Sequence, residues 1–132
     1  MSMVLDTHTV LWYLENSREL SATARERIEG AVAQGREVRI SAISLIEIIY
    51  LVERKRLPEG ALARLRSALD DPSTALSIAS VNAAIANAVE SVPRSVVPDM
   101  PDRIIAATAA HLGVPLVTRD RRLLSIGIPT IW

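Results

Sequence analysis

Short apolar stretches alternate along this chain with longer segments of helical character. The apolar stretches are Met3–Leu5, Val38–Ile40, Leu76–Ala79, Pro115–Thr118 and, as a last edge, Ile128–Ile131. Parallel strands need a crossover connection of about a dozen residues or more, usually a helix, so this alternation predicts a parallel sheet with helices on both faces. We therefore expect an α/β fold with a central, mainly parallel sheet of four to five strands.

The composition is typical of one compact domain spanning residues 1–132. Hydrophobic residues make up 49% of the chain, and no apolar run reaches the roughly 18 residues that a membrane-spanning helix needs. The chain has no cysteine, which excludes a disulfide framework and a thiolate metal site. No basic segment followed by an apolar one is seen at the start, so we expect a cytoplasmic protein without membrane contact.

The charge balance limits how the chain could bind nucleic acid. Lys and Arg number 15 and Asp and Glu number 15, so the formal net charge is zero, which argues against a broad basic surface. An acidic pocket with a basic rim remains compatible with this balance. Aromatic residues make up only 3% of the chain, with no Phe, so a stacking platform for single strands is poorly supported.

Four of the six aspartates stand where a parallel sheet places its ligands. Asp6 ends the first strand, Asp120 follows the fourth, and Asp99 and Asp102 open a helix whose first turn contains Pro101. Each of them alone could be an ordinary helix or turn cap. Because the carboxyl ends of parallel strands share one edge, we expect Asp6, Asp102 and Asp120 to meet there. Asp99 is expected to cap the helix or to be an outer partner of the site.

Glu47 is the fourth candidate acid, because it lies in an otherwise apolar helical segment, Ile43–Val52. An unpaired buried carboxylate is costly, so this side chain needs a partner. One explanation is a capping box with Ser44, three residues earlier. The other is that Glu47 is a metal ligand at the top of its helix.

Clustered carboxylates repel one another unless a cation neutralises them, and hard oxygen ligands suit Mg²⁺ or Mn²⁺. Such a site is suited to the hydrolysis of phosphodiesters. Thr7 and Thr118 adjoin two of the acids and could orient a carboxylate or a bound water. His8 is the remaining polar group nearby, and we expect it to face away into helix packing. Candidates for binding phosphate are the arginines beside the acids, which are Arg103, Arg119 and Arg121.

The motifs, taken in order, resemble those of PIN domains, and more narrowly those of VapC-type toxins from toxin–antitoxin pairs. The resemblance covers essentially the whole chain, in the family's order. Its motifs are Leu5–His8, Ser41–Ile48, Asp99–Ala109 and Val117–Asp120. Met100 stands where the family usually has an aromatic or other apolar residue, which is a mild departure.

This resemblance implies a three-layer α/β/α fold and an Mg²⁺- or Mn²⁺-dependent endoribonuclease. The family's acidic quartet falls on Asp6, Glu47, Asp102 and Asp120, and Asp99 matches a frequent accessory acid. The resemblance also implies a cognate antitoxin protein that blocks the site, and a homodimer that forms a heterotetramer or larger assembly with it.

Three other functions remain open from the sequence. A dehalogenase-like phosphatase needs a second Asp two positions after the first, where this chain has His8, and it needs a downstream catalytic Lys. A receiver-like domain needs a Lys after its later strands, whereas Lys55 is the only lysine. A PIN-like binding module that has lost its activity is the third alternative.

Overall fold

The computed structural model describes residues 2–132, which contain one five-stranded sheet. Its strands lie in the order β3-β2-β1-β4-β5, and every neighbouring pair is parallel. Their bounds are β1 Met3–Leu5, β2 Val38–Ser41, β3 Leu76–Ala79, β4 Leu116–Val117 and β5 Thr130–Ile131. The predicted parallel sheet is confirmed, and β1 lies at its centre.

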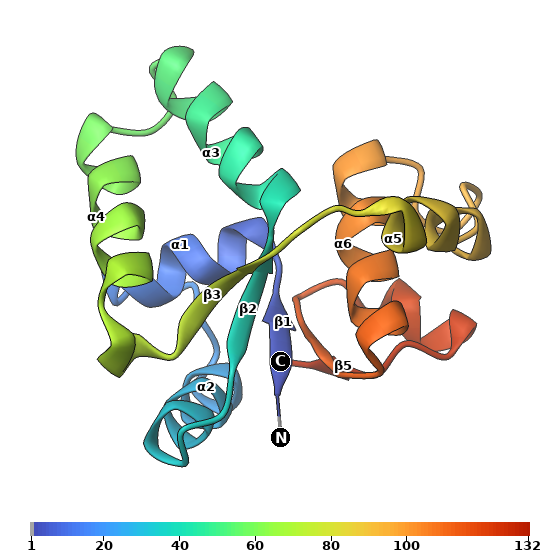
Figure 1. Ribbon diagram of the computed structural model, residues 1–132, viewed down its shortest axis with the longest axis horizontal. Coiled ribbons are helices and arrows are strands. Elements are labelled where there is room, and N and C mark those ends of the chain that lie inside the picture. The colour runs from blue at the N-terminus through green and yellow to red at the C-terminus, as the bar shows by residue number, and fades with distance from the viewer. Residues whose placement is uncertain (1) are drawn as a thin grey trace.

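Helices cover both faces of the sheet, so the molecule has three layers (Figure 1). The α-helices are α1 Thr7–Glu15, α2 Ala22–Ala33, α3 Ala42–Glu53, α4 Glu59–Asp70, α5 Ala83–Ala88 and α6 Met100–Leu112. Three short 3-10 helices complete the described chain: η1 Pro72–Thr74, η2 Val89–Ser91 and η3 Arg121–Ile126. The α/β/α architecture expected from the sequence is confirmed. In the described residues no helix is both long and apolar enough to cross a membrane.

The alternation of side chains along the central strands creates two hydrophobic cores. Met3 and Leu5 of β1 pack into the core under α1, α2 and α4, whereas Val4 packs into the core under α5 and α6. Successive residues of a strand point to opposite faces, so a buried strand must be apolar throughout. All three residues of β1 are buried, and this central strand is therefore fixed from both sides.

The small residues of α6 allow that helix to pack closely against the sheet. Ile105, Ala106, Ala107 and Ala109 are almost fully buried in the second core. Pro101 lies in the first turn and Gly113 caps the other end with a φ of 67°, a left-handed conformation that glycine adopts at no steric cost. The start of α6 is thereby held at the carboxyl edge of the sheet.

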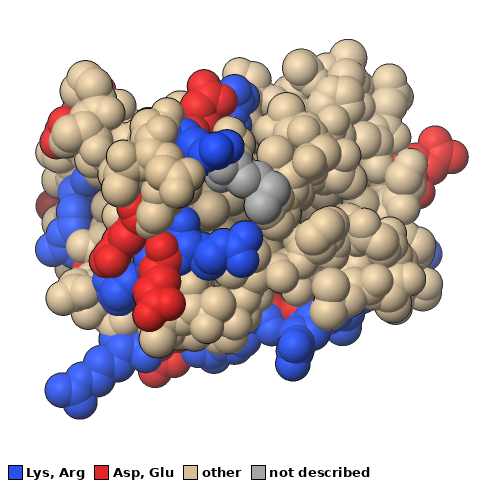
Figure 2. Space-filling view, turned by 90° about the horizontal axis from the view of Figure 1, so that it is seen from below, with Lys and Arg blue, Asp and Glu red and all other residues tan. Residues whose placement is uncertain are grey.

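Charged side chains are unevenly spread over the face that carries the amino ends of the strands. In Figure 2, Lys and Arg gather mainly on the half that holds α2 and α4, and the half that holds α5 and α6 is mostly uncharged. No broad basic surface is seen on this face, which fits the zero net charge of the chain.

Candidate metal centre at the carboxyl edge of the sheet

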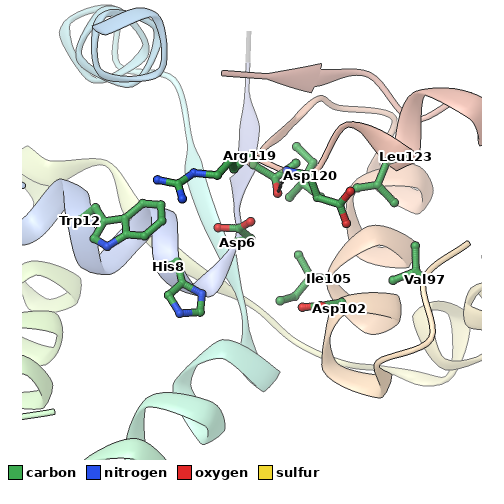
Figure 3. A pocket seen from close by; sticks show the side chains of 11 residues that line it. Asp6, His8, Trp12, Val97, Asp102, Ile105, Arg119, Asp120 and Leu123 are labelled. Carbon is green, nitrogen blue, oxygen red and sulfur yellow. Dashed lines mark hydrogen bonds between the residues drawn. The ribbon is translucent and has the colours of Figure 1, made fainter. Parts of the chain in front are cut away.

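Asp6 connects the central strand to the first helix. Its backbone N–H donates to the carbonyl of Val117 on β4, which fixes the end of β1 beside β4. Its carboxylate caps α1 by accepting a hydrogen bond of 2.9 Å from the N–H of Thr9. Only one carboxylate oxygen is used in this cap. The Asp6 side chain also lines the pocket shown in Figure 3.

Glu47 is joined to the same edge through Thr7. The Thr7 hydroxyl donates a hydrogen bond of 2.6 Å to Glu47 Oε1 and lies 2.9 Å from the hydroxyl of Ser44. Because a hydroxyl has a single proton, the Ser44 hydroxyl is the donor toward Thr7. The capping-box interpretation of Ser44 and Glu47 is wrong, since Ser41 caps α3 and Glu47 lies a full turn inside the helix.

Burial raises the pKa of Glu47 above its ordinary value. The hydrogen bond from Thr7 partly opposes that effect, because it stabilises the ionised form. The negative charges of Asp99 and Asp6 also raise this pKa, and His8 lowers it. Glu47 is therefore within electrostatic range of both Asp6 and Asp99.

Asp99 and Asp102 occupy different positions at the start of α6, and the predicted cap at Asp99 is confirmed. Asp99 is the N-cap residue, and its carboxylate accepts a hydrogen bond of 3.3 Å from the N–H of Asp102. Asp102 lies in the first turn and lines the pocket. Desolvation, followed by the charges of Asp99, Glu47, Asp6 and Asp120, raises the pKa of Asp102 from 3.8 to about 6.

Asp120 follows β4 and caps η3. Its carboxylate accepts a bidentate interaction from the Arg122 guanidinium, with Nη2 at 2.7 Å and Nε at 3.0 Å, and a further hydrogen bond from the Arg122 N–H. These contacts hold the pKa of Asp120 below its usual value, with the Arg122 side chain as the main cause. The buried hydroxyl of Thr118 accepts from the Asp120 N–H at 3.1 Å, so Thr118 fixes the backbone of this acid.

A pocket of about 400 Å³ lies between these acids. Asp6 lies near its middle, with Asp102 and Asp120 on the α6 side and His8 on the α1 side (Figure 3). Its lining residues are Asp6, His8, Trp12, Val97, Asp102, Ile105, Leu116, Thr118, Arg119, Asp120 and Leu123. Glu47 is not a lining residue, and its link to the site is the hydrogen bond from Thr7, which follows Asp6 in the chain. The expectation that His8 faces into helix packing is wrong, because its side chain is exposed beside the acids.

The donor set fits a hard divalent cation. At their present positions in residues 2–132, no three His, Asp or Glu side chains lie close enough together to hold a metal ion. The charges of the other three acids of the quartet are among the causes that raise the pKa of Asp102, so all four acids are electrostatically coupled to this position. Three carboxylates line one pocket, and a fourth is joined to the same edge of the sheet through Thr7; together they offer the oxygen ligands that Mg²⁺ and Mn²⁺ prefer.

The three arginines proposed for phosphate binding have different surroundings. Arg103 donates to the backbone carbonyls of Val92 and Val89, at 2.9 and 3.0 Å, and so holds η2 against α6. Arg119 is paired with Glu19 at 2.9 Å and lies over two indole rings. Arg121 is exposed at the start of η3.

Two features of the site were missed from the sequence. Ser44 orients Thr7, and Trp12 forms part of the pocket wall. His8 and Trp12 are four residues apart on the helix that follows Asp6. This spacing could have indicated that both side chains lie on the same face of that helix.

Comparisons with known proteins agree with this architecture. The family model of the PIN domain matches residues 3–129. Ribonuclease VapC22 of Mycobacterium tuberculosis is 33% identical over 134 residues, which cover 99% of this chain and 98% of that protein.

Two solved structures share the fold over almost the whole chain. VapBC2 from Rickettsia felis, bound to a DNA fragment from its promoter, aligns with a TM-score of 0.75 and 18% identity, covering 98% of this chain and 97% of the other. DNA-bound VapBC from Salmonella typhimurium aligns with a TM-score of 0.73 and 24% identity, covering 98% and 96%.

Proposed function

The chain belongs to the PIN-domain family, and from this membership we propose that it is a metal-dependent endoribonuclease that acts as the toxin of a toxin–antitoxin pair. The observation that carries the proposal is the meeting of Asp6, Asp102 and Asp120 at one pocket, with Glu47 tied to its edge through Thr7. The relative that is named a ribonuclease supports the activity, because the similarity extends over nearly the full length of both chains.

In this proposal Asp6, Asp102, Asp120 and Glu47 hold Mg²⁺ or Mn²⁺. A bound divalent ion would polarise a phosphoryl oxygen and make water a stronger nucleophile near neutral pH. Thr7 orients the Glu47 carboxylate, Thr118 fixes the backbone of Asp120, and Asp99 fixes the first turn of α6 by capping it. These contacts preorganise the acids, which lowers the cost of bringing four negative charges together.

The charges around the pocket bear on substrate binding. RNA is an anion, and the acids repel it until a cation offsets them. Of the predicted phosphate contacts, the exposed Arg121 is the freest to fulfil that role, whereas Arg103 uses two donors on backbone carbonyls. We therefore assign Arg103 the role of positioning α6 and Arg121 the role of binding the phosphates of the RNA backbone.

We further propose a small antitoxin protein as partner, a homodimer as the assembly unit, a heterotetramer or larger complex with the antitoxin, and a cytoplasmic location. The VapBC complexes that share this fold support the partner. Co-expression of this chain with the protein encoded by the neighbouring short reading frame tests it. Co-purification and rescue of growth are expected, and unimpeded growth without the partner would contradict the toxin assignment.

RNA cleavage by the purified protein tests the activity. Structured RNAs are incubated with Mg²⁺ or Mn²⁺, with EDTA, and with the Asp6→Asn protein; Asp70→Asn is the matched control, because Asp70 is an exposed acid at the end of α4. We expect cleavage by the parent and the control only, and only with metal. Cleavage that survives both EDTA and Asp6→Asn would refute the metal mechanism. Absence of cleavage over many RNAs, together with normal growth on expression, would favour a binding module without activity.

A further inference from the structure

His8, Trp12 and Arg119 line the side of the pocket opposite α6, and Trp132 contacts this group from outside the pocket lining. The guanidinium carbon of Arg119 lies 4.7 Å from the centre of the Trp12 ring and 5.6 Å from that of Trp132. The two indole rings are 5.9 Å apart and meet edge to face at 61°. His8 extends the cluster, with its ring 5.5 Å from that of Trp12.

Arg119 is held in place and is still accessible. Its Nη2 donates to Glu19 Oε2 at 2.9 Å, and the guanidinium lies over both indole rings. The Arg119 side chain nevertheless remains 56% exposed. A planar cation that is held in place and still partly open to solvent is suited to stack against another flat ring.

This cluster adjoins the candidate metal centre directly. His8, Trp12 and Arg119 line the same pocket as Asp6, Asp102 and Asp120, and Figure 3 shows Arg119 reaching from the acids toward Trp12. A ligand on this wall would therefore lie within one pocket width of the bond to be cleaved.

The charge of the pocket favours a neutral, flat ligand over an anion on this wall. Three carboxylates line the pocket, and the guanidinium of Arg119 is already paired with Glu19. A free phosphate would meet the carboxylates, whereas an uncharged base would meet a π-surface and a cation. A base within a duplex does not expose its face, so the ligand that fits is an unpaired base.

We propose that Trp12, Trp132 and Arg119 form a stacking surface that binds an unpaired base next to the phosphate that is cleaved. This inference rests on the proposed ribonuclease function and makes it more specific, since it selects RNA whose cleaved bond is flanked by a single-stranded base. It also differs from the expectation that a chain with 3% aromatic residues lacks a stacking platform, because two of its few aromatic side chains converge on one arginine.

Intrinsic fluorescence offers a direct assay, because the chain has only two tryptophans and both belong to the cluster. A short unpaired RNA is titrated into the full chain in EDTA, and is compared with a series in which one base at a time is replaced by an abasic site. All members carry the same number of phosphates, so charge repulsion is the same throughout. We expect quenching by the intact RNA and, for one abasic position, binding that is weaker by about 5- to 150-fold.

Substitutions separate stacking from phosphate binding. Arg119→Lys keeps the charge and removes the planar group. We expect this protein to bind the intact RNA as weakly as the parent protein binds the abasic RNA. Removing the base should then weaken its binding little further. Arg94→Lys, at an exposed arginine outside the pocket, should leave binding unchanged. Trp12→Phe keeps an aromatic ring at this position and should retain most of the affinity for RNA. This conservative variant serves as a control, because it separates loss of stacking from a general folding defect.

The possible outcomes distinguish failure of the stacking surface from failure of the proposed ribonuclease function. Equal binding of intact and abasic RNA, with Arg119→Lys unchanged, would overturn the stacking surface and leave RNA binding in place. Metal-dependent cleavage that is equally fast for the intact RNA and for every abasic member of the series would also overturn it alone. Neither binding nor cleavage of any RNA would overturn both proposals.

Discussion

Replacing Asp102 with Asn removes one of the repelling charges of the pocket without changing its shape. The pKa of Asp102 is raised to about 6 by desolvation and by the neighbouring acids, so the folded protein binds this proton more tightly than the unfolded chain does. The ion-free protein should therefore gain stability as the pH falls toward 4, and lose it as the pH rises through 6. Above pH 7 the ionised Asp102 works against folding, and Asp102→Asn should then stabilise the protein.

The rise of the pKa from 3.8 to about 6 sets an upper limit of about 3 kcal/mol on this gain in the free energy of unfolding. Asp102 is an exposed residue, and solvent screens its interactions, so we expect about 1 kcal/mol. For a chain of this length, that corresponds to a rise in Tm of about 3 to 5 °C.

Thermal unfolding in EDTA at pH 7.5 and at pH 4 measures the effect. The gain should be present at pH 7.5 and absent at pH 4, where Asp102 of the parent protein is already protonated. Asp71→Asn serves as the control and should give no gain, since hydrogen bonds from Ser73 lower the pKa of Asp71 and favour its ionised form. A lower Tm of Asp102→Asn at pH 7.5, or the same gain at both pH values, would refute the reasoning.

Three further substitutions test the supports of the site. Thr7→Val removes the hydrogen bond that opposes the raised pKa of Glu47, so a carboxyl titration followed by NMR should show a further rise of that pKa. RNA cleavage should fall about 10- to 100-fold. Thr7→Ser keeps the hydroxyl and should restore both the pKa and the cleavage rate. Arg122→Gln removes the main cause of the lowered pKa of Asp120, which should move up toward its ordinary value in the same titration; an unchanged pKa would show that the pair does not persist in solution. Arg103→Gln loses two charged hydrogen bonds to backbone carbonyls. Urea unfolding should therefore show a decrease of about 1 to 3 kcal/mol in the free energy of unfolding. An unchanged free energy of unfolding would show that the Arg103 side chain does not make these hydrogen bonds in solution.

The sheet, and the placement of Asp6, Asp102 and Asp120 around one pocket, were predictable because both follow from local patterns. The buried residues of β1 form a short apolar run, and the parallel arrangement then places the residue after each strand at one edge. The positions of Asp99 and Asp102 were also predictable, since an Asp two residues before Pro101 suits the N-cap and an Asp directly after it lies in the first turn.

The side-chain partners were not predictable, because they depend on contacts between distant segments. Thr7 and Glu47 are 40 residues apart, and nothing local to Glu47 distinguishes a bond to Thr7 from a capping box with Ser44. Arg119 and Glu19 are 100 residues apart, and their pairing brings Arg119 over Trp12. Composition indicates how many aromatic residues a chain has, and only the fold determines which of them meet.

Calorimetric titration of the metal-free protein with Mn²⁺ tests most directly whether the four acids hold a divalent cation. We expect saturable binding by the parent chain at pH 7.5, a large loss of affinity in Asp6→Asn and Asp102→Asn, and unchanged binding in Asp70→Asn. Binding that is equally strong in all four proteins would contradict the assignment of Asp6, Glu47, Asp102 and Asp120 as a metal centre.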